Sequence, residues 1–536
     1  TSVPPESHRA IAVPRTDPEH HRMLAHVHTA AVLGMEPFAV RVDVHLCSGL
    51  PSFTVVGLAH GAVREGRERV TAALRSSGFD LPNRRITVNL APADVPKDGT
   101  ALDLPIAIGL LAAGGQAAVA ALEHTAFLGE LGLDGSLRPV AGVLPIASLC
   151  RAAGLVDLIV PRENAPEAAL VSGLRVFAAP DLSAVVDHLS GARPLVPTRV
   201  DLDALLHRDP TEAPDFRDVR GQGAAKRALE VAAAGAHNVL LVGPPGAGKT
   251  MLARRLPGIL PALSLEEALD VTRVHSVAGY LRGGGALVTE RPFRSPHHTV
   301  TDAGLVGGGT PIRPGEISLA HHGVLFLDEL AEYRRNVLEV LRQPLEEGVV
   351  RLSRARASVL YPARFLLVTA MNPCPCGYWG DGSDRCLCDP GVVLRYQGRV
   401  SGPLMDRIDL HLHVPAVPFE SLEGGSGDEG DGPSSEEVRR RVAEARAAQR
   451  DRFADSPGVH ANGHMRPSDL RRWCRPSARV AHLLQRAVER SRLSARAYHR
   501  ILKVARTIAD LAGASEIGQE HAAEAVHYRS MDRVRA

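Results

Sequence analysis

A glycine-rich run at residues 243–250 has the clearest chemical signature in the sequence. It reads Gly-Pro-Pro-Gly-Ala-Gly-Lys-Thr and fits the phosphate-loop pattern G-x-x-x-x-G-K-[ST] at every fixed position. In such loops backbone N–H groups wrap an anion, the lysine reaches the β- and γ-phosphates, and the threonine hydroxyl binds Mg²⁺. The apolar residues 239–242 predict a strand before it, and 251–256 have helical spacing. We therefore predict a site for ATP and Mg²⁺ formed by Gly243, Pro244, Pro245, Gly246, Ala247, Gly248, Lys249 and Thr250.

Two later apolar runs end in polar residues of the kind that complete a nucleotide site. Residues 324–327 lead into Asp328 and Glu329, and a second run leads into Asn372. We predict that Asp328 binds Mg²⁺ together with Thr250 and that Glu329 lies beside the attacking water. Asn372 would position that water or sense the γ-phosphate. The order of phosphate loop, acidic strand and polar-tipped strand is the layout of an AAA+ ATPase.

Two further arginines could act on the nucleotide. Arg407 follows a predicted helix and precedes a predicted strand at 411–414, which suits an arginine finger that reaches the γ-phosphate of a neighbouring subunit. A finger of this kind implies a ring of identical chains. Arg496 could serve as a second sensor of the nucleotide, and Arg500, one turn further along the helix, is the rival for that role.

Four of the seven cysteines cluster just after Asn372. Two C-x-C pairs separated by a glycine-bearing loop can close on one tetrahedral Zn²⁺, although this spacing is tighter than the usual C-x-x-C. Reduced loop cysteines or a redox pair are the alternatives. The predicted zinc ligands are Cys374, Cys376, Cys386 and Cys388.

The elements around these motifs predict an AAA+ core at 215–418. Residues 218–222 suit the segment that closes over adenine, and 224–234 should continue as a helix. The stretch from the phosphate loop to Asp328 is longer than one crossover helix requires, so we predict a Gly/Pro-rich insert. Its histidines, His297, His298, His321 and His322, lack an accompanying acid or cysteine spacing, which favours loop packing over a metal site.

Between the acidic strand and Asn372 we predict a helix at 336–345 and a β-hairpin at 348–364. The residues expected near its tip are Ser353, Arg354 and Arg356. In a ring, such a basic tip would point into the pore and hold a phosphate backbone. A solvated hairpin without a ligand is the alternative.

A chain of 536 residues is too long for one core, and roughly three domains are expected. The fold class is therefore α/β multidomain. The most apolar stretch, 101–122, contains an aspartate and three glycines and suits a core strand and helix better than a membrane span. We expect a cytoplasmic protein without membrane association, because no signal-peptide layout or disulfide framework is evident.

The first part of the chain divides into three predicted segments. Residues 1–22 lack periodicity and suggest a disordered extension, 23–190 alternate short strands and helices, and 191–214 suggest a linker. Within the second segment, Pro96-Lys-Asp-Gly and the later stretch from Phe127 resemble the Lon protease domain. The serine and lysine positions of that family fall at Ala101 and Leu144, so the resemblance implies a Lon-like α/β fold without peptidase activity. Lys97 would then be a surface or structural lysine.

The last part of the chain begins with an acidic Gly/Ser-rich linker at 419–433. Residues 434–536 show helical patterns and predict a helical lid domain. This segment carries 21 Arg and Lys against 12 Asp and Glu, a net charge of +9. The basic excess could bind nucleic acid or could simply cover helix surfaces and subunit contacts.

From Met23 onward the chain resembles the Mg-chelatase-like AAA+ proteins called ComM or YifB. The matching stretches are Ser48-Gly-Leu-Pro-Ser-Phe-Thr-Val-Val-Gly-Leu, Asn89-Leu-Ala-Pro-Ala-Asp, Phe293-Arg-Ser-Pro-His-His, residues 313–330 and Ala370-Met-Asn-Pro-Cys-Pro-Cys-Gly. The resemblance implies an ATP-driven hexameric DNA motor that promotes branch migration when incoming DNA is recombined. The acidic linker is longer than is usual in that family.

The sequence thus predicts an ATPase, with DNA of single-stranded or branched form as partner. Three other functions remain open at this stage. The chain could be a magnesium-chelatase-type subunit that drives metal insertion or remodels a protein partner. It could be an ATP-dependent protease, which Ala101 and Leu144 disfavour. It could also be a scaffold whose nucleotide only controls assembly.

Overall fold

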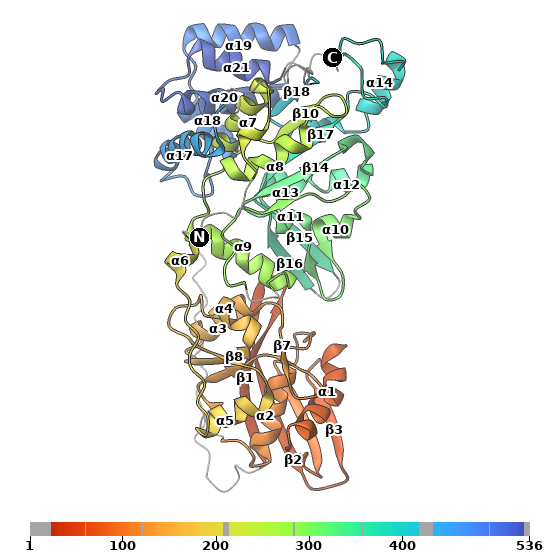
Figure 1. The fold of residues 1–536 in the computed structure, drawn as a ribbon, viewed down its shortest axis with the longest axis vertical. Coiled ribbons are helices and arrows are strands. Elements are labelled where there is room, and N and C mark those ends of the chain that lie inside the picture. Colours follow the sequence, from red (N-terminus) through yellow and green to blue (C-terminus); the bar gives the residue numbers. More distant parts are fainter. Residues whose placement is uncertain are drawn as a thin grey trace, which may run out of the picture. The chain divides into compact units, whose positions relative to one another are not determined.

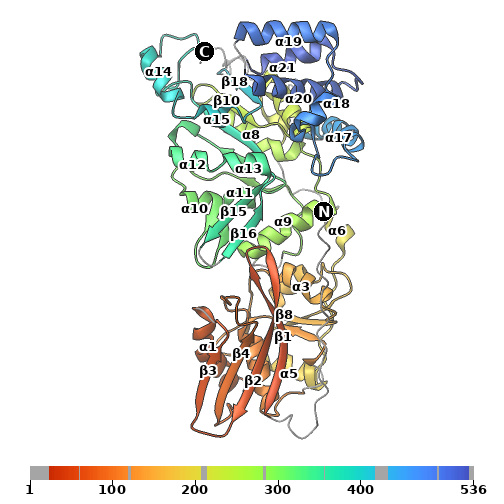
Figure 2. The same cartoon turned by 180° about the vertical axis from the view of Figure 1, so that it is seen from behind.

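The computed structural model describes residues 23–58, 61–118, 122–206, 214–281, 285–354, 357–416, 432–491 and 494–529. The chain divides into two compact units, shown in Figures 1 and 2. The first unit is Thr1–Val200 with Gly279–Ala286, and the second is Asp201–Ala278 with Leu287–Ala536. The predicted extension at 1–22 and most of the acidic linker at 419–433 lie outside the described residues.

The first unit is built on a seven-stranded mixed sheet with the order β3-β4-β2-β1-β5-β8-β9. Its strands are β1 (Leu24–Leu33), β2 (Glu36–Cys47), β3 (Ser52–Val56), β4 (Arg85–Ala91), β5 (Thr125–Phe127), β8 (Asp157–Pro161) and β9 (Arg175–Ala179). Strands β1, β2 and β4 pair antiparallel, and the other pairs are parallel. The short strands expected in this region are confirmed, and buried side chains alternate along β2.

Helices complete this unit: α1 (Ala62–Ser76), α2 (Asp103–Ala113), α3 (Val143–Ala152), α4 (Ala165–Ala168) and α5 (Leu182–Ser190). Every residue of α2 is buried, which explains why the 101–122 stretch is so apolar. The expected core helix is confirmed, whereas no strand lies in the described residues of this stretch. Asp181 starts α5, because its carboxylate accepts a hydrogen bond from Ala184 N at 2.8 Å. The predicted linker that follows contains α6 (Leu202–Leu206).

Lys97 is completely buried, so it is not a surface lysine. Its Nζ has no hydrogen-bond partner among the residues that the structure describes. Burial lowers its pKa, against the attraction of Asp94. Leu144 is buried in α3, and Ala101 is partly buried. The Lon-like character of this unit stays a prediction.

The second unit is organised around a five-stranded sheet with the order β11-β14-β17-β10-β18. The strands are β10 (Val239–Val242), β11 (Phe293–Arg294), β14 (Val324–Leu327), β17 (Leu366–Met371) and β18 (Leu410–His413), and every neighbouring pair is parallel. All residues of β10, β14 and β17 are buried, as their continuous apolar runs predicted. Because the strands are parallel, the residues that follow β10, β14 and β17 meet at one edge.

Between α8 (Lys249–Ile259) and β14 the chain forms α9 (Leu265–Ala278), β11, α10 (Asp302–Val306), β12 (Gly307–Gly308), β13 (Arg313–Pro314) and α11 (Glu316–Leu319). The expectation of a loop insert missed β11, which is the edge strand of the sheet. After β14, two short helices, α12 (Arg335–Glu339) and α13 (Arg342–Glu347), replace the single predicted helix. The predicted hairpin is confirmed as β15 (Val349–Arg354) and β16 (Ala357–Pro362).

The chain from 432 to 529 is helical where it is described, with α17 (Ser435–Arg452), α18 (Pro467–Trp473), α19 (Ala478–Ser491), α20 (Ala495–Leu511) and α21 (Gln519–His527). A capping box between Ser434 and Glu437 starts α17. Helix α17 packs on α8 and on α7 (Gly223–Gly235), and α20 also packs on α7. These helices lie beside the parallel sheet in Figure 1, and their buried side chains form one hydrophobic core with it. No described helix is long and apolar enough to cross a membrane.

Candidate nucleotide site

The phosphate loop connects β10 to α8, as the sequence predicted. Gly246 and Gly248 have φ angles of 78° and 83°, a left-handed conformation that favours glycine. At Gly243 a Cβ atom would lie only 2.0 Å from the Val414 carbonyl oxygen, so no larger side chain fits there. The glycines therefore serve the shape of the turn, and the free N–H groups at the start of α8 suit an anion.

Lys249 lies in the first turn of α8 and is mostly buried. Its Nζ donates to the carbonyl oxygens of Gly243 and Pro244 at 2.6 and 2.9 Å, and to Asn372 Oδ1 at 3.2 Å. Burial lowers the pKa of Lys249, while Asp328 and Glu329 oppose that shift. The ammonium group is thus held between the loop and the end of β17.

Thr250 and Asp328 meet at the edge of the sheet, although 78 positions separate them in the sequence. The Thr250 hydroxyl donates to Asp328 Oδ2 at 2.6 Å, and Asp328 Oδ1 accepts from the Glu329 backbone N–H at 2.9 Å. A hydroxyl beside a carboxylate is the oxygen donor set that Mg²⁺ prefers. The residues present therefore fit the predicted cation.

Glu329, the residue after Asp328, has a left-handed backbone conformation with a φ of 52°. Its side chain is 57% exposed. Its Oε2 lies 3.3 Å from His298 Nδ1. His298 follows β11, the neighbour of β14 in the sheet. Sequence reasoning assigned this histidine to loop packing and missed the contact. The stretch Phe293-Arg-Ser-Pro-His-His marked this segment in the sequence. Only the pairing of β11 with β14 shows that it brings His298 to Glu329.

Gln222 joins the phosphate loop to the segment after β18. Its Nε2 donates to the Ala247 carbonyl oxygen at 3.3 Å and to the Pro415 carbonyl oxygen at 2.8 Å. The residue has a φ of 55° and occupies the N-cap position of α7, without a side-chain hydrogen bond to the helix. This position is compatible with the predicted adenine-side segment at 218–222, which stays a prediction.

Arg407 lies at the opposite edge of the sheet, because it precedes β18 whereas the phosphate loop follows the parallel strand β10. The side chain is mostly buried, pairs with Glu346 and donates to the Pro403 carbonyl oxygen at 2.6 Å. The structure therefore does not bring Arg407 to the phosphate loop of its own chain. A role as a finger requires the nucleotide of another subunit.

The two candidate sensor arginines lie in α20. Arg496 is exposed in its first turn. Arg500 pairs with Asp409 and donates to the Arg407 carbonyl oxygen at 3.3 Å, which holds it at the edge away from the phosphate loop. This arrangement ties Arg500 to Arg407. A sensor role for either arginine stays a prediction.

The remaining predicted residues lie outside the nucleotide site proper. Among the histidines of the insert, His321 and His322 approach Asp270, an acid that sequence spacing did not reveal. However, His321 Nδ1 accepts from Arg364 N at 3.0 Å, and His322 pairs with Glu267 at 3.5 Å, so both histidines have packing roles. At the hairpin tip, Ser353 is exposed. Arg356 and the side chain of Arg354 lie outside the described part of the chain.

The four clustered cysteines do come together: all four sulfur atoms lie within 4.8 Å of one another.

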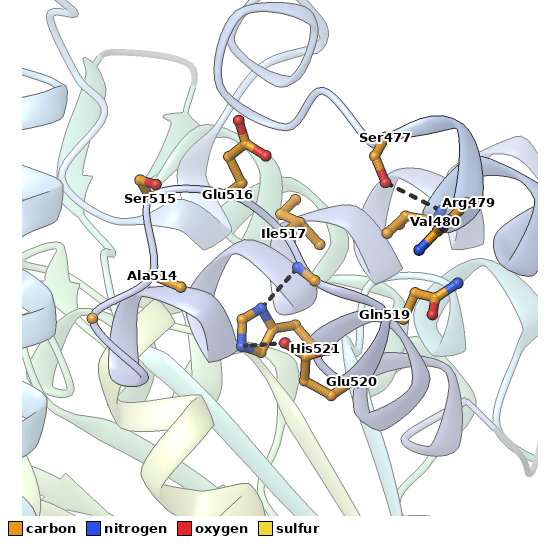
Figure 3. Close-up of a pocket in the computed structure, with 12 residues that line it drawn as sticks. Ser477, Arg479, Val480, Ala514, Ser515, Glu516, Ile517, Gln519, Glu520 and His521 are labelled. Carbon is orange, nitrogen blue, oxygen red and sulfur yellow. Dashed lines mark hydrogen bonds and ion pairs between the residues drawn. The ribbon is translucent and has the colours of Figure 1, made fainter.

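Figure 3 shows a separate pocket between the start of α19 and the residues before α21. There His521 Nδ1 accepts from Gly518 N at 3.0 Å, and His521 Nε2 lies 3.6 Å from Glu520 Oε1. None of the residues that line this pocket belongs to the predicted nucleotide site.

Comparison with known proteins identifies the family to which this arrangement belongs. The family described as magnesium chelatase, subunit ChlI, matches residues 215–422, and two related ChlI descriptions match 42–164 and the C-terminal part at 432–529. The competence protein ComM of Haemophilus influenzae is 45% identical over 513 residues, covering 95% of this chain and 98% of that protein. YifB of Salmonella typhimurium is 44% identical with the same coverage.

A magnesium-chelatase subunit is a more distant relative. The 38 kDa subunit of Cereibacter sphaeroides is 27% identical over 174 residues, which cover 30% of this chain and 52% of that protein. The long matches to ComM and YifB confirm the resemblance seen in the sequence. The chain belongs to the Mg-chelatase-like ComM/YifB family.

Proposed function

We propose that the protein is an ATPase that forms a ring, hexameric as the family resemblance implies, and moves on single-stranded or branched DNA. One observation carries the ATPase part. Hydrogen bonds from Lys249 to Asn372 and from Thr250 to Asp328 join the phosphate loop to the ends of two other strands. These are the parts from which phosphoryl-transfer sites are built.

Each of these side chains has a defined task in hydrolysis. Lys249 would neutralise the β- and γ-phosphates, and Thr250 and Asp328 would hold Mg²⁺. When bound, the ion would supply positive charge that offsets the charge developing on the phosphoryl oxygens. Glu329 accepts a proton from the attacking water, and Asn372 positions that water. His298 Nδ1 lies 3.3 Å from Glu329 Oε2, and we assign it as a positioning residue for this carboxylate.

The location of Arg407 supports the proposed ring. An arginine before β18 cannot reach the phosphate loop after β10 in the same chain, so its contribution would have to go to a neighbouring subunit. Its pairing with Glu346 supports a preorganised side chain. Arg500 of the C-terminal helices donates to the Arg407 carbonyl oxygen. If these helices act as a lid over the nucleotide, this contact would link the lid to the position of Arg407.

DNA is the proposed substrate of the motor for two reasons. The hairpin β15–β16 presents Arg351 on its exposed face, opposite the buried Val350 and Tyr361. In both views it lies at the end of the second unit away from α19–α21 (Figures 1 and 2). The H. influenzae relative is named a competence protein, and we extend that role to this chain as recombination of incoming DNA by branch migration.

The test is ATP hydrolysis by the purified chain with and without single-stranded and branched DNA, at about 50 and about 200 mM salt. We expect stimulation by DNA that weakens at the higher salt, because phosphate contacts release counterions. Hydrolysis that no DNA changes would overturn the DNA motor while retaining the ATPase. Stimulation by a porphyrin instead would support the magnesium-chelatase alternative, which the similarity to the C. sphaeroides subunit keeps in view.

A further inference from the structure

The cysteine cluster after β17 has the dimensions of a single metal site. Cys374 Sγ lies 3.2 Å from Cys376 Sγ and 3.9 Å from Cys386 Sγ, and Cys376 Sγ lies 3.6 Å from Cys386 Sγ. Cys388 belongs to the same group, in which no two sulfur atoms are more than 4.8 Å apart. Four thiolates at about 2.3 Å from one tetrahedral Zn²⁺ would be about 3.8 Å apart.

Other uses of four cysteines fit these distances less well. Disulfide sulfur atoms are about 2.05 Å apart, and all four cysteines here are free thiols. An iron–sulfur cluster spreads its cysteines over several iron atoms and therefore needs them further apart than one ion does. A single soft cation is the ligand that matches the donor set and its size.

The loop between the two cysteine pairs is fixed by its own contacts. Asp381 Oδ1 accepts from Ser383 N at 2.9 Å and from Ser383 Oγ at 2.7 Å. The Arg385 guanidinium lies 4.6 Å from the centre of the Tyr378 ring. The Cys374 carbonyl accepts from Gly377 N at 3.0 Å, which closes the turn of the first pair. The sulfur atoms are thus brought together by a folded loop.

This loop also touches the nucleotide site. Gly377 has a φ of 90°, and a Cβ atom there would lie 2.6 Å from Pro245 Cδ of the phosphate loop. Helix α14 (Pro390–Gln397) follows the loop. Its Gln397 Nε2 donates to the carbonyl oxygen of Pro373, at the start of the loop, at 3.0 Å. Asn372, which accepts from Lys249, lies two residues before Cys374. The cysteine loop therefore supports both the phosphate loop and the amide that contacts Lys249.

We propose that Cys374, Cys376, Cys386 and Cys388 bind one structural Zn²⁺, which fixes the loop after Asn372 against the phosphate loop. The zinc holds Gly377 in contact with Pro245 and keeps Asn372 within reach of Lys249. It takes no part in hydrolysis itself. Metal binding is independent of the proposed action on DNA, so either proposal can fail while the other stands.

Metal analysis of the full chain, made without a histidine tag in zinc-supplied medium and then dialysed, tests the site. We expect one zinc per chain, released when a mercurial reagent titrates four thiols. Cobalt loaded in its place should give the thiolate-to-cobalt charge-transfer absorption of a tetrahedral sulfur site. Cys386→Ser combined with Cys388→Ser should abolish zinc binding. Cys47→Ser, in β2 of the other unit, should retain it and is the matched control.

The proposed effect of zinc on the nucleotide site is measured separately, as the affinity of the chain for a fluorescent ATP analogue. Zinc removal should weaken it at least about tenfold, as expected when one hydrogen bond to a charged group is lost. Unchanged affinity in the zinc-free chain would overturn the proposed effect of zinc on the nucleotide site.

A dialysed wild-type chain without zinc, in which all four thiols react as fast as in the unfolded protein, would overturn the site. Iron in place of zinc, or two disulfides, would overturn the choice of metal. None of these measurements on the wild-type chain depends on the folding of a variant.

Discussion

The two edges of the parallel sheet in the second unit use charged residues in opposite ways. At the carboxyl-terminal edge, Glu329 is 57% exposed and contacts His298, so its carboxylate retains free hydrogen-bonding capacity. At the amino-terminal edge, the Asp409 side chain is 5% exposed. Asp409 pairs with Arg500 and accepts from the Asn238 backbone N–H at 3.0 Å.

The amino-terminal edge continues as a buried polar network into the C-terminal helices. His237 Nε2 lies 2.8 Å from Thr507 Oγ1, and Asn462 Nδ2 donates to the same hydroxyl and to Asp510. Burial alone would raise the pKa of Asp409, but the charge of Arg500 lowers it below its ordinary value. The acids at the two edges therefore have different surroundings: Glu329 is open to a ligand, as its proposed role requires, and Asp409 belongs to a structural joint.

Arg407→Ala would test this division most severely, because Arg407 lies at the structural edge yet has a proposed catalytic role. We expect the turnover number to fall by about 10³–10⁵-fold, the range known for arginine fingers. Mixing this variant with Glu329→Gln should restore activity, since some interfaces would then combine an intact Glu329 with an intact Arg407. If the mixture stays inactive, the finger does not act between subunits. Thermal melting of the variant controls for the lost pair with Glu346.

Glu329→Gln sharpens the comparison at the other edge. Turnover should fall by about 10²–10⁴-fold, as when a general base is removed, while ATP binding persists. Steady-state hydrolysis and nucleotide binding, measured on the same preparation, separate the two effects. Glu332→Gln is the matched control, because Glu332 is also an exposed acid of this segment but pairs with Arg399 at 3.1 Å. Full activity in Glu329→Gln would contradict the assigned role.

Asp409→Asn should act on stability instead. The change leaves Arg500 without its buried partner, and we expect a loss of about 3–5 kcal/mol in the free energy of unfolding. Denaturant unfolding followed by circular dichroism measures it. The exposed pair of Glu444 with Arg440 provides the control, since Glu444→Gln should cost less than about 1 kcal/mol. Equal losses in the two variants would show that the amino-terminal edge is not a structural joint.

The smallest expected effect concerns the hairpin, which belongs to neither edge. Arg351→Ala removes an exposed charge, paired loosely with Glu347 at 3.7 Å, and should weaken DNA binding a few-fold. The slope of log affinity against log salt should decrease by about one. Fluorescence anisotropy at several salt concentrations gives both quantities. Arg440→Ala, which removes a similarly exposed arginine of α17, should leave the slope unchanged.

The carboxyl-terminal edge could be predicted from the sequence because its signals are local. Lys249, Asp328 and Asn372 each follow a continuous apolar strand, and parallel strands bring such residues to one edge. The contact between His298 and Glu329 depends on β11, which is two residues long and contains Arg294, so it lacks the pattern of a buried strand. Only tertiary pairing makes it part of the sheet.

The amino-terminal edge was beyond sequence reasoning for a related reason. The pair of Asp409 with Arg500 joins residues 91 positions apart, and the contact of His237 with Thr507 spans 270 positions. No local spacing marks such partners. Lys97 is similar: nothing near it in the sequence separates a surface lysine from a buried one, and the structure shows it buried in the first unit.

The two outer strands of the parallel sheet also limit how copies of this chain can associate. Strand β11 is only two residues long, and Pro296, which follows it closely, has no N–H to offer a further strand. On β18 the outward His411 N–H already donates to the Tyr528 carbonyl oxygen at 2.8 Å. These features disfavour strand addition at both edges of this sheet, and with it the aggregation that such addition brings. In the proposed ring, subunits would therefore meet without sharing this sheet, and their interface could open around DNA without breaking strand pairing.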